Sequence, residues 1–163
     1  MKGYFFSTIG RKQILAVAGI AWALFVLTHM AGNLLIFAGP KAYNMYSHAI
    51  VTNPFLIVAE LGLVVFLVFH VVTGLWLSFY NKAARPSGYA VASSGAKKTN
   101  LVMKTMAHQG VLILIFVVLH LITFKYGTHY EATYDGVTVR DLYRLIVEVF
   151  QKPGYVVWYT LLS

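Results

Sequence analysis

The sequence predicts an all-α transmembrane helical bundle with three full spans, the start of a fourth and short interfacial helices. Of the 163 residues, 59% are hydrophobic and only 11% are charged, whereas soluble domains carry about 25% charged residues. The apolar residues form three long uncharged runs, over residues 13–40, 61–81 and 105–124. Each run can supply the roughly 20 residues that cross about 30 Å of hydrocarbon. We therefore expect one membrane domain over residues 1–163.

The first span is expected over residues 13–37, ended by a Gly-Pro pair. Residues 41–52 follow, and their apolar side chains share one helical face, which favours a short helix in the membrane interface. These side chains are Ala42, Met45, Tyr46, Ala49 and Ile50. The second span is expected over residues 54–80. Residues 81–100 are rich in Pro, Gly and Ser, so we expect an aqueous loop there.

The third span is expected over residues 103–126, followed by a polar excursion over residues 127–152. That excursion ends in an amphipathic piece whose apolar face carries Leu142, Leu145, Ile146, Val149 and Phe150. Residues 153–163 begin another apolar run that is too short to cross a bilayer. We interpret this run as the first half of a fourth span that continues beyond Ser163.

The basic residues predict the orientation. Eight of them lie before the first span, between the second and third, or at the very start of the third, with no acidic residue among them: Lys2, Arg11, Lys12, Lys82, Arg85, Lys97, Lys98 and Lys104. Because cytoplasmic segments carry an excess of Lys and Arg, the N-terminus is predicted to be cytoplasmic. This topology accounts for the net charge of +8, and no nucleic-acid partner is expected. The chain has no cysteine, which excludes an iron–sulfur cluster held by this chain and haem attached through Cys-x-x-Cys-His.

Each full span contains one histidine in its apolar part: His29, His70 and His120. An ionisable residue within a span is a functional-site hypothesis by default. At about 1.5 Å per residue, His29 and His120 lie roughly 6–7 Å to the outer side of their span midpoints, and His70 roughly 5 Å to the inner side. Two histidines at one depth can be the axial ligands of a b-type haem. The alternative is that each imidazole hydrogen-bonds a neighbouring helix.

This pairing predicts that His29 and His120 ligate an outer haem iron, while His70 ligates an inner haem iron whose second ligand lies beyond Ser163. Gly19 and Gly110 lie ten residues before His29 and His120. Their missing side chains could give a flat macrocycle room beside the helix, or could simply let helices pack closely.

Two further groups of titratable residues leave alternatives open. Glu60, near the outer end of the second span, could be interfacial or could relay protons to a quinone. His108 lies near the cytoplasmic end of the third span and could contact a haem propionate or the loop. His48 and His129 are expected to be solvated.

Short motifs along the whole chain, taken in order, point to one family. They are Ser7-Thr8-Ile9-Gly10-Arg11-Lys12 before the first span, Thr28-His29-Met30-Ala31-Gly32-Asn33 at its outer end, Phe69-His70-Val71-Val72-Thr73-Gly74, Gly110 with Leu119-His120, and Phe150-Gln151-Lys152-Pro153-Gly154-Tyr155. Together they resemble the cytochrome b membrane-anchor subunit of succinate dehydrogenase and quinol:fumarate reductase, in its single-polypeptide, five-helix, di-haem form.

The resemblance implies an electron-transfer subunit of an oxidoreductase of the tricarboxylic acid cycle, with no catalytic residue of its own. The first and third helices would ligate one haem b through His29 and His120, and the second and fourth would ligate another through His70. The missing ligand is expected about 15–20 residues past Pro153. The implied partners are a flavoprotein subunit, an iron–sulfur subunit, the lipid bilayer and menaquinone or another quinone. The implied location is the bacterial cytoplasmic (inner) membrane, with several spans.

Two other functions stay open at this stage. One is a cytochrome b anchor of a different membrane oxidoreductase, such as a hydrogenase or formate dehydrogenase. The other is a membrane anchor or transporter without haem, whose histidines bond neighbouring helices. The sequence leaves open the direction of turnover, the type of quinone, the coupling to membrane potential and the oligomeric state.

Overall fold

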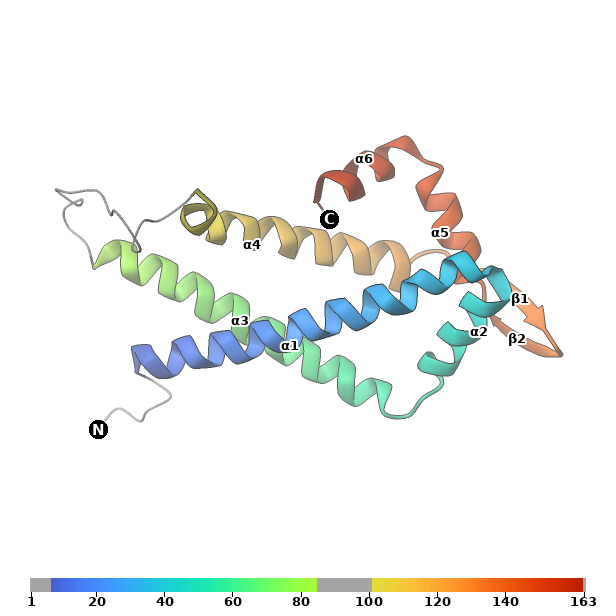
Figure 1. The fold of residues 1–163 in the computed structure, drawn as a ribbon, viewed down its shortest axis with the longest axis horizontal. Helices are drawn as coiled ribbons and strands as arrows, with labels where there is room; N and C mark the ends of the chain where they lie inside the picture. Colours follow the sequence, from blue (N-terminus) through green and yellow to red (C-terminus); the bar gives the residue numbers. More distant parts are fainter. Residues whose placement is uncertain (1–6, 85–100, 163) are drawn as a thin grey trace. The chain divides into compact units, whose positions relative to one another are not determined.

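The computed structural model describes residues 7–84 and 101–162, and it confirms an all-α fold with membrane-spanning character. Three described helical segments are long and apolar enough to cross a membrane: Ile9–Ala38, Leu56–Tyr80 and Thr105–Lys125 (Figure 1). Most of the expected loop over residues 81–100 lies outside the described residues. The chain is therefore a membrane protein by the length and composition of its helices.

The first span consists of two helical segments. Helix α1 runs over Thr8–Asn33 and continues into η2, a tighter 3₁₀ segment over Leu34–Ala38. Gly39 ends it with φ of 98°, a backbone conformation that costs glycine little. Pro40 then opens helix α2, which covers Pro40–Val51, because proline suits the first turn of a helix.

The second and third spans begin and end close to their predicted limits. Helix α3 covers Leu56–Ala83, and helix α4 covers Leu101–His120. Directly after His120 the chain forms η4, a π-helical segment over Leu121–Lys125. The third span is thus an α-helix with a π-helical end, a feature that the apolar pattern did not predict.

A β-hairpin lies in the middle of the polar segment over residues 127–152. Strand β1 (Glu131–Tyr134) pairs with the antiparallel strand β2 (Val137–Arg140), with Tyr134 opposite Val137 and Glu131 opposite Arg140. The turn is Asp135-Gly136, and both residues have positive φ, 51° and 82°. An Asp-Gly pair between residues of high strand propensity is a strong signal for such a turn. The hairpin was not predicted, although the sequence contains this signal.

The last two helices follow at once. Helix α5 covers Leu142–Phe150, and Asp141 caps it by accepting a hydrogen bond of 3.0 Å from the Arg144 amide. Helix α6 covers Pro153–Leu162. The predicted apolar face of α5 is confirmed in part, because Leu145 and Val149 are buried. They form a small core with Tyr159 of α6.

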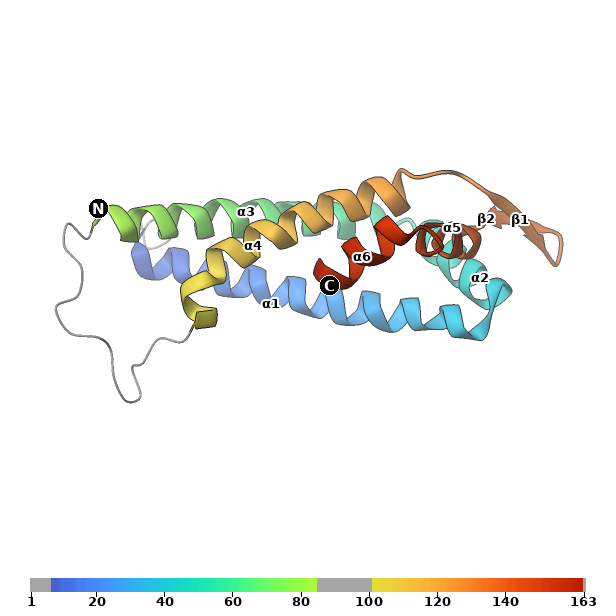
Figure 2. The ribbon, with the colours of Figure 1, turned by 90° about the horizontal axis from the view of Figure 1, so that it is seen from above.

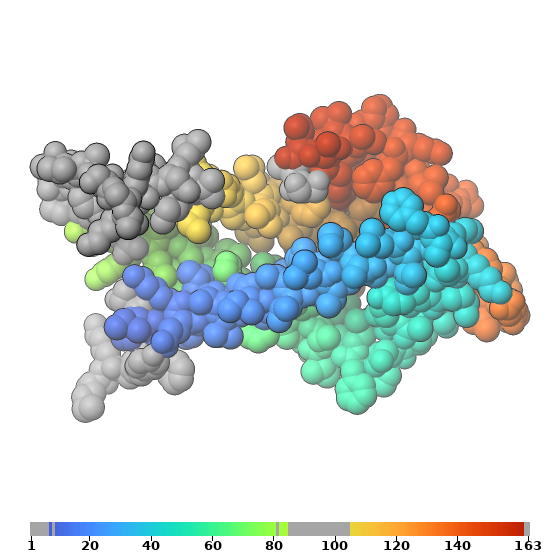
Figure 3. Space-filling model, in the orientation of Figure 1, coloured from blue at the N-terminus to red at the C-terminus, as the bar shows by residue number. Residues whose placement is uncertain are grey.

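Helix α2, the hairpin and α5 pack together, and we call this group the cap. Both ribbon views place the hairpin beside α2 (Figures 1 and 2), and the space-filling view shows the surfaces of η2 and α2 in contact (Figure 3). The cap is organised by Asn44, which is fully buried. Its Nδ2 donates to the Tyr134 hydroxyl at 3.2 Å and to Asp141 Oδ1 at 2.8 Å, while its Oδ1 accepts from the Tyr143 amide at 3.0 Å.

The described residues form two compact units. One contains the described parts of residues 1–22 and 63–112, and the other contains residues 23–62 and the described part of residues 113–163. His70 belongs to the first unit, and His29, His120 and the whole cap belong to the second.

The Asn44 network predicts that Asn44→Ala destabilises the cap. The substitution removes the three hydrogen bonds of a fully buried amide, including the one that satisfies the Tyr143 amide, so the free energy of unfolding should fall by about 1–3 kcal/mol. Thermal unfolding of the detergent-solubilised protein, followed by circular dichroism, measures this change. The control Gln151→Ala removes an exposed amide and should stay within about 0.5 kcal/mol of the parent. Equal effects of the two substitutions would contradict the assignment.

The cap also predicts an acid-sensitive contact. Glu148 accepts hydrogen bonds from the Tyr130 hydroxyl at 2.7 Å and from Arg144 Nε at 2.8 Å. These two bonds, the first being the stronger cause, lower the pKa of Glu148 below its ordinary value of 4.5. A carboxylate whose pKa is lowered on folding stabilises the fold above its unfolded pKa, and this stabilisation is lost as the pH falls through the folded pKa.

The stability difference between the parent and Glu148→Gln should therefore be largest above about pH 4.5 and shrink as the pH falls further. Thermal unfolding midpoints between pH 6 and pH 3 would measure it. The control Glu131→Gln replaces an exposed carboxylate on β1 and should give a smaller difference. A difference between parent and Glu148→Gln that stays constant across this range would refute the coupling.

Candidate functional site

The structure brings His29 and His120 together. His29 lies on α1 and His120 is the last residue of α4, and their ring centroids are 5.9 Å apart with an interplanar angle of 82°. The depth estimate from the sequence placed these two residues at one level, and their contact agrees with that estimate. Two imidazoles from different helices thus share one site.

This ring separation allows two chemical uses. An imidazole nitrogen binds a transition metal at about 2.0 Å, so two rings on opposite sides of one metal ion have centres roughly 6 Å apart. The same separation lies within the 4.5–7 Å range of ordinary edge-to-face aromatic pairs. The centroid distance of 5.9 Å fits both uses.

The burial and hydrogen bonding of the His120 ring support a ligand-binding site. His120 is half-buried, and among the described residues its buried Nδ1 has no hydrogen-bond partner. A buried polar atom without a partner costs free energy, and a bound group that completes it is one explanation for such an atom. The donor set of two imidazoles is the one that binds a b-type haem axially. These residues fit that group.

Aromatic rings surround the histidine pair. Phe25 stacks on His29 at a centroid distance of 5.3 Å, and Phe116 stacks on His120 at 5.7 Å. Phe124 lies 5.1 Å from the His120 ring. Both phenylalanines of α4 and η4 pack against the small core of Tyr159 and α5. The sequence analysis did not single out these rings, although the four-residue spacing of each from its histidine places it one helical turn away.

His70 meets Gly19 in the other unit. A Cβ atom on Gly19 would lie 3.2 Å from His70 Cε1 and 3.6 Å from His70 Nδ1. The close approach of the imidazole to α1 therefore depends on the missing side chain. His70 Nδ1 is buried and has no hydrogen-bond partner among the described residues. Gly110 differs, because no described atom lies within 4 Å of where its Cβ would be.

The other histidines stand apart from these sites. His108 and His129 are exposed, and His48 of α2 is half-buried. Within residues 7–84 and 101–162, no three side chains of His, Cys, Asp or Glu lie close enough to hold a metal ion together. This finding concerns metal sites built from three or more protein side chains. A haem held by histidines needs only two protein ligands.

Glu60 has a basic partner that the sequence analysis missed. Its carboxylate forms a salt bridge with Lys125 Nζ, and both side chains are partly exposed. Lys125 is the last residue of η4, and Glu60 lies in the first part of α3. The pairing favours the interfacial interpretation of Glu60, because an ion pair at the end of a span keeps both charges near water.

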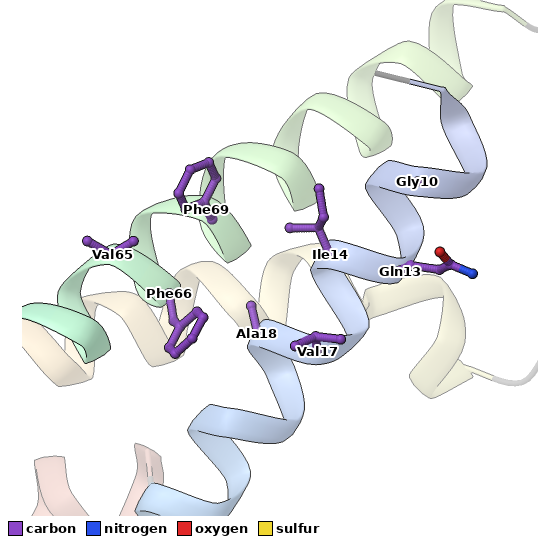
Figure 4. Close-up of a pocket in the computed structure, with 8 residues that line it drawn as sticks. All are labelled: Gly10, Gln13, Ile14, Val17, Ala18, Val65, Phe66 and Phe69. Atoms are coloured by element: carbon purple, nitrogen blue, oxygen red, sulfur yellow. The ribbon is translucent and has the colours of Figure 1, made fainter. Parts of the chain in front are cut away.

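An apolar groove lies between α1 and α3 in the unit that contains His70 (Figure 4). Its lining residues are Gly10, Gln13, Ile14, Val17, Ala18, Val65, Phe66 and Phe69. Only Gln13 carries a polar side chain, and Figure 4 shows its amide pointing away from α3. The groove therefore offers no titratable group for chemistry.

The geometry defines a class, a helical membrane protein with paired histidines in its spans. Comparison with known proteins does not narrow it: no protein-family model matches the chain, and no curated protein or solved structure is significantly similar to it.

The Gly19 contact generates a prediction about His70. In Gly19→Val the added branched side chain must displace the imidazole, because a single Cβ already comes within 3.2 Å of it. The nuclear magnetic resonance signal of His70 in protein labelled with ¹³C at histidine Cε1 should shift. The control Gly62→Ala adds a methyl group where no described atom lies within 4 Å and should leave that signal in place. An unmoved His70 signal in Gly19→Val would show that the two residues are not in contact.

Proposed function

We propose that this chain is the haem-b-containing membrane anchor of a succinate dehydrogenase or fumarate reductase complex. In this role it passes electrons between an iron–sulfur subunit and menaquinone or another quinone. The observation that carries the proposal is the meeting of His29 and His120, from separate helices, at 5.9 Å between ring centroids. The motif resemblance supports the choice of complex.

His29 and His120 would hold the outer haem through one ring nitrogen each. When bound, a haem with two imidazole ligands supplies one-electron transfer without an open coordination position. The chain's own contribution is to hold the two rings. Phe25 and Phe116 stack on them at 5.3 and 5.7 Å, which restricts the rotation of both imidazoles.

His70 would hold the inner haem from α3, with Gly19 of α1 letting the imidazole approach that helix closely. The resemblance implies that the second ligand of that site comes from a fourth helix. The orphaned Nδ1 of His70 supports a functional assignment, since a buried donor or acceptor without a partner is costly.

The basic residues support a cytoplasmic docking face. Arg11, near the start of α1, stacks over the Trp76 ring with its guanidinium carbon 3.7 Å from the ring centre. Lys82, in the last turn of α3, is exposed. With the N-terminus in the cytoplasm, these charges lie where an iron–sulfur subunit would dock, and they also satisfy the positive-inside bias. Chemistry on succinate or fumarate would belong to the flavoprotein subunit.

A purely structural anchor is the competing function from a different class. It is favoured by the edge-to-face geometry of the two imidazoles, which fits aromatic packing. A cytochrome b anchor of a hydrogenase or formate dehydrogenase would keep the haem and change only the partner subunits. Co-purified subunits distinguish that case, and an absorption spectrum distinguishes the structural anchor.

The proposal predicts that the complete protein, purified from membranes with its partners, shows a reduced b-type α-band. Replacing His29 or His120 with Ala should remove the outer haem and leave the inner one, because each substitution deletes one of two axial ligands. Haem content per subunit and the reduced-minus-oxidised spectrum measure this loss, and about half of the haem should disappear.

The control is His129→Ala, which removes an exposed imidazole outside the spans and should retain both haems. Absence of any b-type band in the parent complex would rule out the haem function. If His120→Ala kept both haems, the pairing of His29 with His120 would be wrong.

A further inference from the structure

The end of α4 just beyond His120 has an unusual backbone. The Tyr126 amide donates to the Leu121 carbonyl at 3.0 Å, five residues back, as expected of a π-helical turn. Gly127 follows, and a Cβ atom there would collide with the Thr123 carbonyl oxygen. Turns of this kind are rare and frequently lie at functional sites.

A π-helical end leaves carbonyl groups that its own helix does not satisfy. Arg140 of β2 supplies the donors. Its Nη2 donates to the Phe124 carbonyl at 2.9 Å and to the Gly127 carbonyl at 3.3 Å, and its Nη1 donates to the Lys125 carbonyl at 3.0 Å. One guanidinium thus joins three carbonyls at the end of the third span, a task that its planar fork of donors suits.

The cap holds Arg140 in place from the other side. Arg140 lies opposite Glu131 in the hairpin. The preceding residue, Val139, is 3% exposed. The amide of the following residue, Asp141, donates to the Tyr130 carbonyl at 2.8 Å. Burial lowers the pKa of Arg140 from its ordinary value, but an arginine stays charged in proteins. The guanidinium is therefore a fixed cation between the cap and η4.

The link to the histidine pair runs through Phe124. The Phe124 carbonyl accepts from Arg140, and the Phe124 ring lies 5.1 Å from the His120 ring. Four residues separate Phe124 from His120, so the two rings lie near each other along the same segment of helix. Displacing the Phe124 backbone would move one wall of the His120 site.

We propose that Arg140 is a positioning residue for His120: by clamping the three carbonyls of η4 and Gly127, the cap sets the orientation of the His120 imidazole. The expected consequence is that the properties of the outer haem depend on a residue outside the membrane. This consequence rests on the proposed haem function. Arg140 itself contacts backbone and not the imidazole.

The experiment uses the complete protein purified with its partner subunits, in three variants. R140Q removes the cation, and R140K keeps the charge but lacks the planar fork. The matched control is R144Q, because Arg144 lies in the same cap and contacts Tyr130 and Glu148. Two measurements apply: the electron paramagnetic resonance signal and midpoint potential of each haem, and amide hydrogen exchange of residues 121–127.

R140Q should change the signal and midpoint potential of the outer haem, leave the inner haem unchanged and speed exchange at the Tyr126 amide roughly tenfold or more. R140K should shift the same quantities by less, and R144Q should shift none of them. If R140Q does not assemble, R140K becomes the deciding variant. An unchanged outer haem in R140K would then overturn the positioning role.

The two proposals fail in different ways. A parent complex without a b-type α-band removes the haem function. A normal parent spectrum with an outer haem that is unaltered in both R140Q and R140K overturns the role of Arg140 alone. Equal changes in R144Q and R140Q would also overturn it, because the effect would then come from the cap as a whole.

Discussion

Hydrocarbon gives a peptide group no hydrogen-bonding partner, and the described chain depends on this constraint throughout. Every backbone donor and acceptor in a span must be satisfied within the helix, because each unsatisfied group costs several kcal/mol. The three spans accordingly run as continuous helical segments, even where α1 tightens into η2 and α4 loosens into η4. Irregular backbone is confined to the helix ends and the cap, where side chains can supply partners.

The same constraint explains which polar groups lie at the ends of the spans. Arg140 supplies donors for the last carbonyls of the third span, and Glu60 and Lys125 neutralise each other at the level where two spans end. The buried amide of Asn44 has each of its polar atoms bonded within the cap. Five buried polar atoms of the described residues have no hydrogen-bond partner: Nδ1 of His70 and of His120, Arg140 Nε, Trp158 Nε1 and the Tyr159 hydroxyl. Among these groups the imidazoles are the functional candidates, because imidazole is the common metal ligand.

Some of the site could be predicted from the sequence because it depends on distance along a helix. His29 and His120 were placed at one depth by counting residues at about 1.5 Å each, and their rings do meet. Other contacts of the site could not be predicted in this way, because they depend on the direction in which each side chain points. Gly19 was linked to haem clearance near the inner level, and the structure shows the contact that this position makes, with His70. The partners Lys125 and Arg140 were not foreseen.

The sequence by itself determined the membrane class and the three candidate spans, because apolar run length is a local quantity. The predicted depth of each histidine follows from helical rise, which is also local. It also contained the hairpin, through Asp135-Gly136, although the signal was passed over. Only the tertiary structure decided which side chains meet. The π-helical turn after His120 and the hairpin register bring Arg140 to the Phe124 carbonyl, and neither can be read from apolar periodicity.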